Sequence, residues 1–395
     1  MNKKESIKVL IRKILFYSCS GIVSLVPKKE GLVLFTSWFG QKYLDNCKYV
    51  YEYFLDNSDY HPVWMTRNPI IYKQLKEEGK PVEMFNTLKG RWTIIRAQAA
   101  FASVQFSDYN TWLMPKCVIV DLNHGHPIKD PGAVGETGSY LREVYRMILQ
   151  RVSFFSIVAG SKTKETYNVV PIPKDHIIIS DFARNDVFVD EKLREGKNKV
   201  IEEFKKNRRA IVYMPTHRSD GKEIMDMTSI LPLDDIQTYC EANNVIFIIK
   251  KHFYHRNEHE NLNKYPNIID VTDCDEIDPQ VLLYQAEMLI SDYSACYIDY
   301  MLLQRPIVFY QYDLESYKNG QRKLYYDFDA LQIAPVVHAK DKLLPTIKRL
   351  LSDGDSYLEK RMKFAQENYF DNIEQKEGRA KVKRIFDNLY NQYIR

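Results

Sequence analysis

Apolar residues along this chain gather into short runs, and longer segments with helical spacing of apolar and polar residues lie between them. Between Gly31 and Asp181 the runs are LVLFTS, HPVWMT, FASVQF, CVIVDLNH, FFSIVAGS and HIIIS. They are rich in β-branched and aromatic residues and have no polar alternate face, which is typical of parallel strands covered by helices on both sides. The pattern therefore predicts an open α/β domain over this part of the chain.

A second set of such runs, AIVYMPT, VIFIIKKH, EMLISDYS and RPIVFYQYD, follows a charged stretch without a strand signal. A chain of 395 residues also exceeds what one hydrophobic core usually supports. We therefore expect two α/β domains. The predicted organisation is an N-terminal segment 1–30, a first domain 31–188, a charged linker 189–209, a second domain 210–350 and C-terminal helices 351–395.

Polar motifs follow four of the strand-like runs at the point where each run ends. NHGHPIKD follows CVIVDL, THRSD follows AIVYMP, KKHFYH follows VIFII, and SDYS follows EMLI. Open α/β sheets bind ligands beyond the carboxyl ends of their strands. Solubility alone does not require charged and hydroxyl residues at these positions, so we expect two sheets that face each other across a cleft and share a ligand site.

The charge balance restricts the partners. The chain has 56 Lys and Arg against 52 Asp and Glu, a net charge of only +4, far from the basic excess of a protein that tracks a nucleic-acid backbone. We expect no nucleic-acid partner, so any anion must be bound by a local site. The six cysteines include no C-x-x-C pair, which argues against a disulfide framework and a thiolate zinc site and agrees with a reducing cytoplasm.

The N-terminal segment combines basic and apolar residues. The apolar run from Ile14 to Val26 is shorter than the roughly 20 residues that span a bilayer, and no A-x-A-like cleavage site follows it. We interpret the segment as a basic amphipathic helix, peripheral to the cytoplasmic face of the cell membrane and bound to its anionic surface. A helix packed on the protein's own surface is the alternative. The basic residues are Lys3, Lys4, Lys8, Arg12 and Lys13, and the inserted residues are Ile14, Leu15, Phe16, Ile22 and Leu25.

The segment ISDYSACYIDYMLLQ predicts a strand that ends near Asp292, a tight turn and a helix that begins at Ser294. With Ser294 at the N-cap, the first-turn N–H groups and the positive end of the helix dipole can hold an anion. An ordinary helix cap is the alternative. Cationic and imidazole donors at other strand ends favour a diphosphate site, because they can neutralise charge that grows as a bond breaks. These donors are Lys250, Lys251 and His252 of KKH, Arg218 and Arg184.

Other patterns could bind a metal or a nucleotide, but each has a plainer interpretation. His252, His255 and His259 share one helical face and could bind zinc, yet no cysteine or carboxylate completes the set. The aspartate pairs of DCD and DFD match a divalent-ion motif only as often as chance allows. GAVGETG lacks a preceding strand, so it fits a mobile loop better than a dinucleotide fingerprint. We expect neither a metal nor a cofactor.

Taken together, the motifs resemble those of the CDP-glycerol glycerophosphotransferases of teichoic acid and capsule synthesis. The order is similar throughout: YLDNCKYVYEY, HGHPIK, ARND, YMPTHR, KKH, ISDYSACYIDY, RPIVFYQYDLESY and RKLYYDF. The resemblance covers roughly Leu32 to Val337. It implies a GT-B-like fold of two Rossmann-type domains, with the CDP-polyol bound to the C-terminal domain.

The chain departs from the family pattern at five positions of these motifs, whereas the two histidines shared with the family, here His124 and His252, are present. The family usually has Trp at Asn123, a small residue at His126, Trp or Phe at His217, Pro at Phe253 and a hydroxyl residue at Ala295.

The resemblance implies a role for each shared histidine. His124 is the base that takes a proton from the acceptor hydroxyl, and Gly125 lets the substrate approach the backbone. Imidazole ordinarily titrates near neutral pH, which suits this task. His252 contacts the donor diphosphate. The other candidate substrate-binding residues are His126, which is either an acceptor contact or a structural donor, and Lys129, Arg184, Arg218, Lys250, Asp292, Ser294 and Arg322.

We therefore expect transfer of a polyol phosphate, with glycerol phosphate favoured, from a CDP-polyol to a hydroxyl of a lipid-linked glycan or growing polymer, with release of CMP. The attack is on phosphorus, and protein cations can neutralise the diphosphate without a metal. A GT-B glycosyltransferase that uses a nucleotide sugar, and so attacks carbon, is the alternative. A third class of protein is a catalytically silent scaffold for envelope synthesis. We expect such a protein to lack the paired histidines, and both are present here. Self-association is left open.

Overall fold

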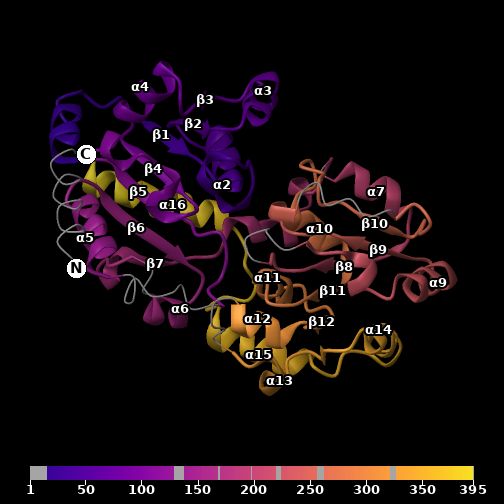
Figure 1. The fold of residues 1–395 in the computed structure, drawn as a ribbon. Coiled ribbons are helices and arrows are strands. Elements are labelled where there is room, and N and C mark those ends of the chain that lie inside the picture. The colour runs from indigo at the N-terminus through magenta and orange to yellow at the C-terminus, as the bar shows by residue number, and fades with distance from the viewer. Residues whose placement is uncertain are drawn as a thin grey trace. The chain divides into compact units, whose positions relative to one another are not determined.

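The computed structural model describes residues 16–128, 138–167, 170–196, 198–218, 224–255, 262–320 and 326–394. These residues form two compact units, each built around one sheet (Figure 1). The first unit takes the described residues of Met1–His124, Pro131–Asp186 and Phe370–Arg395, and the second those of Gly125–Asp130 and Val187–Tyr369. The predicted α/β fold with two parallel sheets is confirmed.

Within the described residues, the first unit has a seven-stranded sheet in the order β3-β2-β1-β4-β5-β6-β7, and all its neighbouring strands are parallel. Every residue of the central strands β1, β4 and β5 is buried, because helices cover both faces, and this explains the lack of polar alternation in the sequence. The strands are β1 Leu32–Phe35, β2 His61–Thr66, β3 Val82–Met84, β4 Ala99–Ala102, β5 Val118–Asp121, β6 Ser153–Val158 and β7 Ile177–Ile179.

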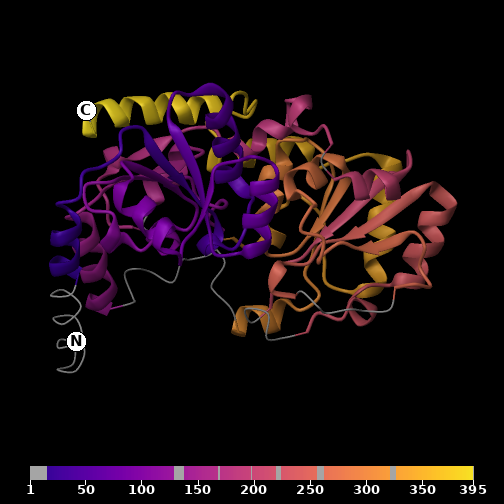
Figure 2. The same ribbon diagram turned by 90° about the horizontal axis from the view of Figure 1, so that it is seen from above.

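The last helix described, α16 (Gly378–Tyr393), belongs to the first unit and lies along one face of it (Figure 2). Phe386 of α16 is fully buried, and its ring centroid lies 5.5 Å from that of Phe54 and 5.0 Å from that of Phe101. The other helices of this unit are residues 16–23, α2 Asp45–Asn57, α3 Pro69–Glu77, α4 Leu88–Arg96, α5 Gly138–Leu149 and α6 Ser161–Thr166.

Asp186 of the ARND motif holds the start of α16. Its carboxylate accepts hydrogen bonds from the backbone N–H groups of Gly378 (2.6 Å) and Arg379 (3.0 Å) and from Nε of Arg379 (2.8 Å). Glycine is required here, because a Cβ at position 378 would lie 2.9 Å from the carbonyl oxygen of Phe182. The motif thus joins two parts of the first unit that are far apart in sequence.

The second unit has, within its described residues, a six-stranded parallel sheet in the order β10-β9-β8-β11-β12-β13. Its strands are β8 Arg209–Met214, β9 Val245–Ile249, β10 Ile268–Asp270, β11 Ala286–Ser291, β12 Ile307–Tyr310 and β13 Val336–Val337. Its helices are α7 Lys199–Lys205, α8 Met227–Ile230, α9 Leu233–Asn243, α10 Pro279–Gln285, α11 Cys296–Met301, α12 Leu314–Gly320, α13 Phe328–Leu331, α14 Lys340–Asp353 and α15 Leu358–Asn368.

The division of the chain differs from the predicted one. The stretch 189–209, expected to be a linker, lies in the second unit and contains α7. The segment 351–395, predicted to form C-terminal helices, contributes α15 to the second unit and α16 to the first. The described residues directly after His124, 125–128, belong to the second unit, whereas those from 138 to 186 belong to the first.

The predicted membrane-binding helix of residues 1–30 stays a prediction, because residues 1–15 lie outside the described residues. Val23 is buried in the core of the first unit and Phe16 packs against it, whereas Ile22 and Leu25 are 70% and 81% exposed. Among the described helices, none has the length and apolar character needed to cross a bilayer.

Candidate active site

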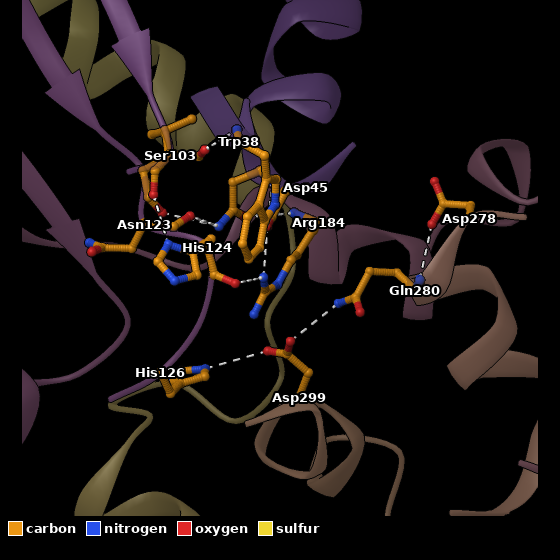
Figure 3. Close-up of polar contacts among 12 residues, drawn as sticks. Trp38, Asp45, Ser103, Asn123, His124, His126, Arg184, Asp278, Gln280 and Asp299 are labelled. Carbon is orange, nitrogen blue, oxygen red and sulfur yellow. Dashed lines mark hydrogen bonds and ion pairs between the residues drawn. The ribbon is translucent and has the colours of Figure 1, made fainter. Parts of the chain in front are cut away.

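His124 lies in the turn after β5, and its ring is held through one nitrogen. Nδ1 lies 3.0 Å from the carbonyl oxygen of Ser103, which follows β4 (Figure 3). A carbonyl oxygen can only accept, so Nδ1 carries the hydrogen, and in the neutral ring Nε2 has the lone pair. His124 is an exposed residue, so a ligand can reach it. The arrangement is that of a general base held in one tautomer.

Trp38, in the loop after β1, packs against the ring of His124. The ring centroids are 4.8 Å apart, and the planes meet at 58°. The backbone N–H of Trp38 donates to Oγ of Ser103 at 2.9 Å, and its Nε1 donates to Asp45 at 3.3 Å (Figure 3). Ser103 therefore positions both rings, one through its hydroxyl and the other through its carbonyl group.

Asp108 fixes the two loops that carry Trp38 and Ser103. Its buried carboxylate accepts hydrogen bonds from the backbone N–H groups of Phe39 (2.7 Å), Ser103 (2.6 Å) and Val104 (2.8 Å). Burial raises the pKa of Asp108, an effect that these hydrogen bonds oppose. No motif of the sequence pointed to these three residues, although Trp38 and Asp108 follow strand-like runs and Ser103 lies within one.

Arg184 was expected to bind the diphosphate, but it lies 7% exposed beneath the His124 turn. Its Nη1 donates to Asp45 and to the backbone carbonyl oxygen of His124, both at 2.7 Å (Figure 3). Its backbone N–H donates to Asn46 at 3.1 Å, and Nδ2 of Asn46 donates to the carbonyl oxygen of Asn123 at 3.0 Å. Arg184 therefore supports the backbone of the candidate base.

Asn123, which stands where the resembling family has Trp, shapes the same turn. Its φ of 53° lies in the left-handed region, which Asn tolerates. Nδ2 donates to Oγ of Ser156 at 3.0 Å and to the carbonyl oxygen of Ile157 at 2.7 Å.

Asp121, at the end of β5, is fully buried. This burial raises the pKa of Asp121 to about 7, and the nearby charge of Asp108 contributes to the rise as the second largest cause.

In the second unit His252 follows β9, and its ring is held in the opposite tautomer. Nδ1 accepts a hydrogen bond from the backbone N–H of Tyr254 at 3.3 Å, within the 3₁₀ turn Phe253–His255. A nitrogen that accepts carries no hydrogen, so in the neutral ring Nε2 carries it. The ring centroids of His217 and Tyr254 lie 4.9 Å and 4.7 Å from that of His252. His252 can therefore donate a hydrogen bond to an anion.

Arg218 and Asp292, both expected to contact substrate, are buried and paired with each other. Nη2 of Arg218 donates to Asp292 at 2.8 Å, and its Nε donates to Asp313 at 2.6 Å. Nη1 donates to the carbonyl oxygen of Thr216 at 2.6 Å. Burial lowers the pKa of Arg218, but the charges of Asp292 and Asp313 more than offset it, so the pKa is raised. The bridge joins the loops after β8, β11 and β12.

Ser294 lies in the turn between β11 and α11 but does not cap the helix. The helix begins at Cys296, and Ala295 occupies the N-cap position without a side-chain hydrogen bond, so the predicted capping role is wrong. Burial raises the pKa of the Cys296 thiol to about 11, and the nearby Ser294 hydroxyl opposes that rise. Of the two lysines that follow β9, Lys251 is buried with Nζ 3.4 Å from Asp270, whereas Lys250 is partly exposed.

His126 is buried in the second unit. Its Nε2 lies 3.4 Å from Oδ1 of Asp299 on α11, and the other carboxylate oxygen of Asp299 lies 3.4 Å from Gln280 (Figure 3). These contacts favour a structural role for His126 over contact with the acceptor.

Gly125, the residue before His126, is partly exposed. Two other expected substrate-binding residues, Lys129 and Arg322, lie outside the described residues.

The zinc interpretation of HFYHRNEH finds no support in the part of the chain that the structure describes. There, no three His, Cys, Asp or Glu side chains are grouped so that they could hold a metal, and His259 lies outside the described residues. His255 is fully buried, and its Nε2 accepts from the backbone N–H of Arg218 at 3.1 Å. In DFD, Asp327 caps α13, because its carboxylate accepts a hydrogen bond from the backbone N–H of Asp329.

Comparison with known proteins shows the family and the fold of the chain. Residues 18–390 match the family described as CDP-glycerol:poly(glycerophosphate) glycerophosphotransferase. The chain is 28% identical to a teichoic acid poly(glycerol phosphate) polymerase of Bacillus spizizenii over 370 residues. The aligned part makes up 88% of this chain and 89% of the relative.

A teichoic acid glycerol-phosphate transferase of Staphylococcus aureus is 25% identical to the chain over 384 residues, 92% of this chain and 94% of the relative. The fold is similar to that of the wall teichoic acid polymerase TagF, with a TM-score of 0.74 at 19% identity over 99% of this chain and 97% of that chain. The GT-B-like fold expected from the motifs is therefore confirmed.

Proposed function

The chain belongs to the CDP-glycerol:poly(glycerophosphate) glycerophosphotransferase family, and from this premise we propose how its own residues carry out the transfer. It transfers a polyol phosphate from CDP-glycerol to a hydroxyl group of a teichoic acid polymer. The acceptor oxygen forms a bond to the β-phosphorus, the bond from that phosphorus to the bridging oxygen breaks, and CMP leaves with that oxygen. The acceptor hydroxyl gives up one proton.

His124 takes that proton on Nε2. The hydrogen bond from Nδ1 to the carbonyl oxygen of Ser103 supports this assignment, because it leaves the lone pair on Nε2 and stabilises the ring once it is charged. Arg184 binds the backbone carbonyl oxygen of His124 and so keeps the turn in place.

His252 donates from Nε2 to the diphosphate, and Lys250 adds a positive charge at the same strand end. The N–H of Tyr254 on Nδ1 of His252 supports this role, since it directs the ring hydrogen to the opposite nitrogen. Negative charge that develops on the leaving CMP is stabilised by such fixed donors. The backbone N–H of Arg218 donates to Nε2 of His255 at 3.1 Å and so joins this loop to the buried Arg218–Asp292 pair.

The opposite tautomers of the two histidines carry the assignment: one ring presents a lone pair and the other presents a hydrogen. Incubation with CDP-glycerol, CDP-ribitol and UDP-sugars, with CMP and UDP release measured, tests the donor. We expect CMP release from CDP-glycerol that depends on acceptor. Release of UDP from a nucleotide sugar at a comparable rate would instead favour the glycosyltransferase alternative.

The acceptor is a lipid-linked glycan or a growing polymer, and the enzyme works at the cytoplasmic face of the membrane. The relatives' teichoic acid products support the acceptor class. The basic N-terminal segment and the exposed Ile22 and Leu25 support membrane contact, because anionic lipids attract Lys and Arg by about 1 kcal/mol each. The mass of the product made from a defined lipid-linked disaccharide distinguishes addition of one unit from polymerisation.

A further inference from the structure

The loop Ser37–Gly40, with sequence SWFG, has an unusual backbone. Trp38 and Phe39 are consecutive aromatic residues with φ of 48° and 58°, in the left-handed region. This region is unfavourable for any residue with a Cβ, and more so for a bulky one. Backbone strain of this kind gathers at functional sites and persists only where the surroundings impose it.

The surroundings of this loop do impose it. Asp108 accepts from the N–H of Phe39 at 2.7 Å, and Ser103 accepts from the N–H of Trp38 at 2.9 Å. The carbonyl oxygen of Gly40 accepts from the hydroxyl of Thr66 at 2.9 Å and from the N–H of Arg67 at 2.7 Å. Side chains and backbone groups from several neighbouring elements hold the loop, so the surrounding structure fixes its left-handed conformation.

This conformation places the indole of Trp38 beside the candidate base and leaves the next residue in the chain, Phe39, exposed. The indole of Trp38 is in contact with the ring of His124, with centroids 4.8 Å apart (Figure 3), and Phe39 is 40% exposed. A hydroxyl that approaches Nε2 of His124 brings its neighbouring carbon atoms close to Trp38. Aromatic rings offer a large apolar face, which suits the C–H side of a sugar or polyol.

We propose that Trp38 and Phe39 form the acceptor-binding surface, which packs against the carbon face of the sugar ring or polyol chain that carries the attacking hydroxyl. The inference rests on the proposed function, because it takes His124 as the group that the hydroxyl approaches. Asp108 and Ser103 are then positioning residues that hold this surface and the base in one arrangement.

The test separates acceptor binding from proton transfer. A short water-soluble glycerol-phosphate oligomer is titrated calorimetrically into the full chain carrying His124→Ala, which removes turnover, and into the same chain with Trp38→Leu added. We expect at least a tenfold loss of acceptor affinity from Trp38→Leu, partial recovery with Trp38→Phe, and no change in affinity for CDP-glycerol. Unchanged acceptor affinity in Trp38→Leu would overturn the proposal.

Trp112→Leu is the matched control, because Trp112 lies in the same unit and is 41% exposed; it should leave acceptor affinity unchanged, and an equal loss there would contradict a specific surface. Phe39→Ala provides a second variant if Trp38→Leu does not fold, since the partly exposed ring contributes less to packing. It should weaken acceptor binding at least threefold, and unchanged affinity would count against the proposal. Activity of His124→Ala tests the base assignment separately.

Discussion

The Nδ1 atom of His124 lies 3.0 Å from the carbonyl oxygen of Ser103. The partner of the candidate base is thus a backbone group from a neighbouring strand end, not a carboxylate. Its position depends on the loop that contains it, and that loop is held by Asp108. The orientation of the His124 ring therefore depends on Asp108, which holds the loop and not the ring itself.

His124→Ala should abolish transfer and leave donor binding intact, because the imidazole acts on the acceptor proton. General bases contribute about 10² to 10⁴ in rate, so kcat at saturating acceptor should fall by this factor while calorimetry shows unchanged affinity for CDP-glycerol. A fall of less than tenfold would rule out the base assignment.

Asp108→Asn should lower kcat and shift its pH profile, because an amide has one accepting oxygen and its NH₂ group faces the backbone N–H groups of Phe39, Ser103 and Val104. Leaving such buried groups unsatisfied costs about 1–3 kcal/mol, measurable by urea unfolding. Asp175→Asn is the control, since Asp175 is an exposed aspartate of the same unit; it should leave kcat and its pH profile unchanged. An Asp108→Asn variant with an unchanged pH profile would show that the carboxylate is only structural.

His252→Ala should weaken donor binding and spare acceptor binding. A hydrogen bond to a charged group contributes about 1.5–3 kcal/mol, so the Kd for CDP-glycerol should rise about 10- to 150-fold. His252→Gln retains an N–H donor at a similar distance and should recover part of the affinity. Equal affinity in wild type and His252→Ala would remove His252 from the donor site.

Asp121→Asn should stabilise the protein at high pH. Burial raises the pKa of Asp121 from 3.8 to about 7, so between these values the folded state keeps a proton that the unfolded chain loses. The stabilisation is fully present below pH 4 and is lost as pH rises through 7. A shift of three units corresponds to about 4 kcal/mol, so the advantage of the variant should grow by up to that amount between pH 4 and pH 8.

Urea unfolding of both proteins across this pH range measures that difference. Asp226→Asn is the matched control of opposite sign, because the hydrogen bond from Thr228 lowers the pKa of Asp226. The stability that ionised Asp226 adds is complete once the pH is above the ordinary pKa of 3.8, so the difference between wild type and Asp226→Asn should stay constant from about pH 5 to pH 8. A difference between wild type and Asp121→Asn that does not change with pH would mean that Asp121 stays ionised in the fold.

Replacing Ile22 and Leu25 with Ser in the full chain should reduce binding to anionic liposomes without loss of stability, because both side chains are exposed. A chain that begins at Lys28 should lose liposome binding too, but also about 2 kcal/mol of stability, since it lacks the buried Val23. Both should turn over a short soluble acceptor. Co-sedimentation equal to wild type in both variants would place membrane contact elsewhere.

The apolar runs predicted both sheets because buried parallel strands leave a strong local signal. The strands that the pattern missed, β3, β10 and β13, are two or three residues long and lie at sheet edges, where so few residues form no run. The predicted domain ranges differ from the two compact units for another reason. Helix α16 packs in the first unit through contacts such as that of Phe386 with Phe54, and a contact between residues so far apart in the chain cannot be inferred from a local sequence pattern.

The candidate site was only partly predictable. Motifs at strand ends identified His124 and His252, but not whether a basic residue there faces a ligand. Arg218 and Arg184 are bound to buried carboxylates, and such pairing depends on which loops are neighbours in space. Asp108 is not part of a recognisable motif, because its carboxylate accepts hydrogen bonds from backbone N–H groups, which every residue type except proline provides.

The return of residues 370–394 to the first unit affects how the chain can fold as it is synthesised. Gly31 donates its N–H to the hydroxyl of Tyr390 at 3.1 Å, so the core of the first unit is complete only after α16 has left the ribosome. Roughly 200 residues separate β7 from α16, a delay of about 10–40 s at about 5–20 residues per second. The second unit is therefore synthesised in full while the sheet of the first still lacks a covering helix, and the apolar surface left open then is where chaperones would act.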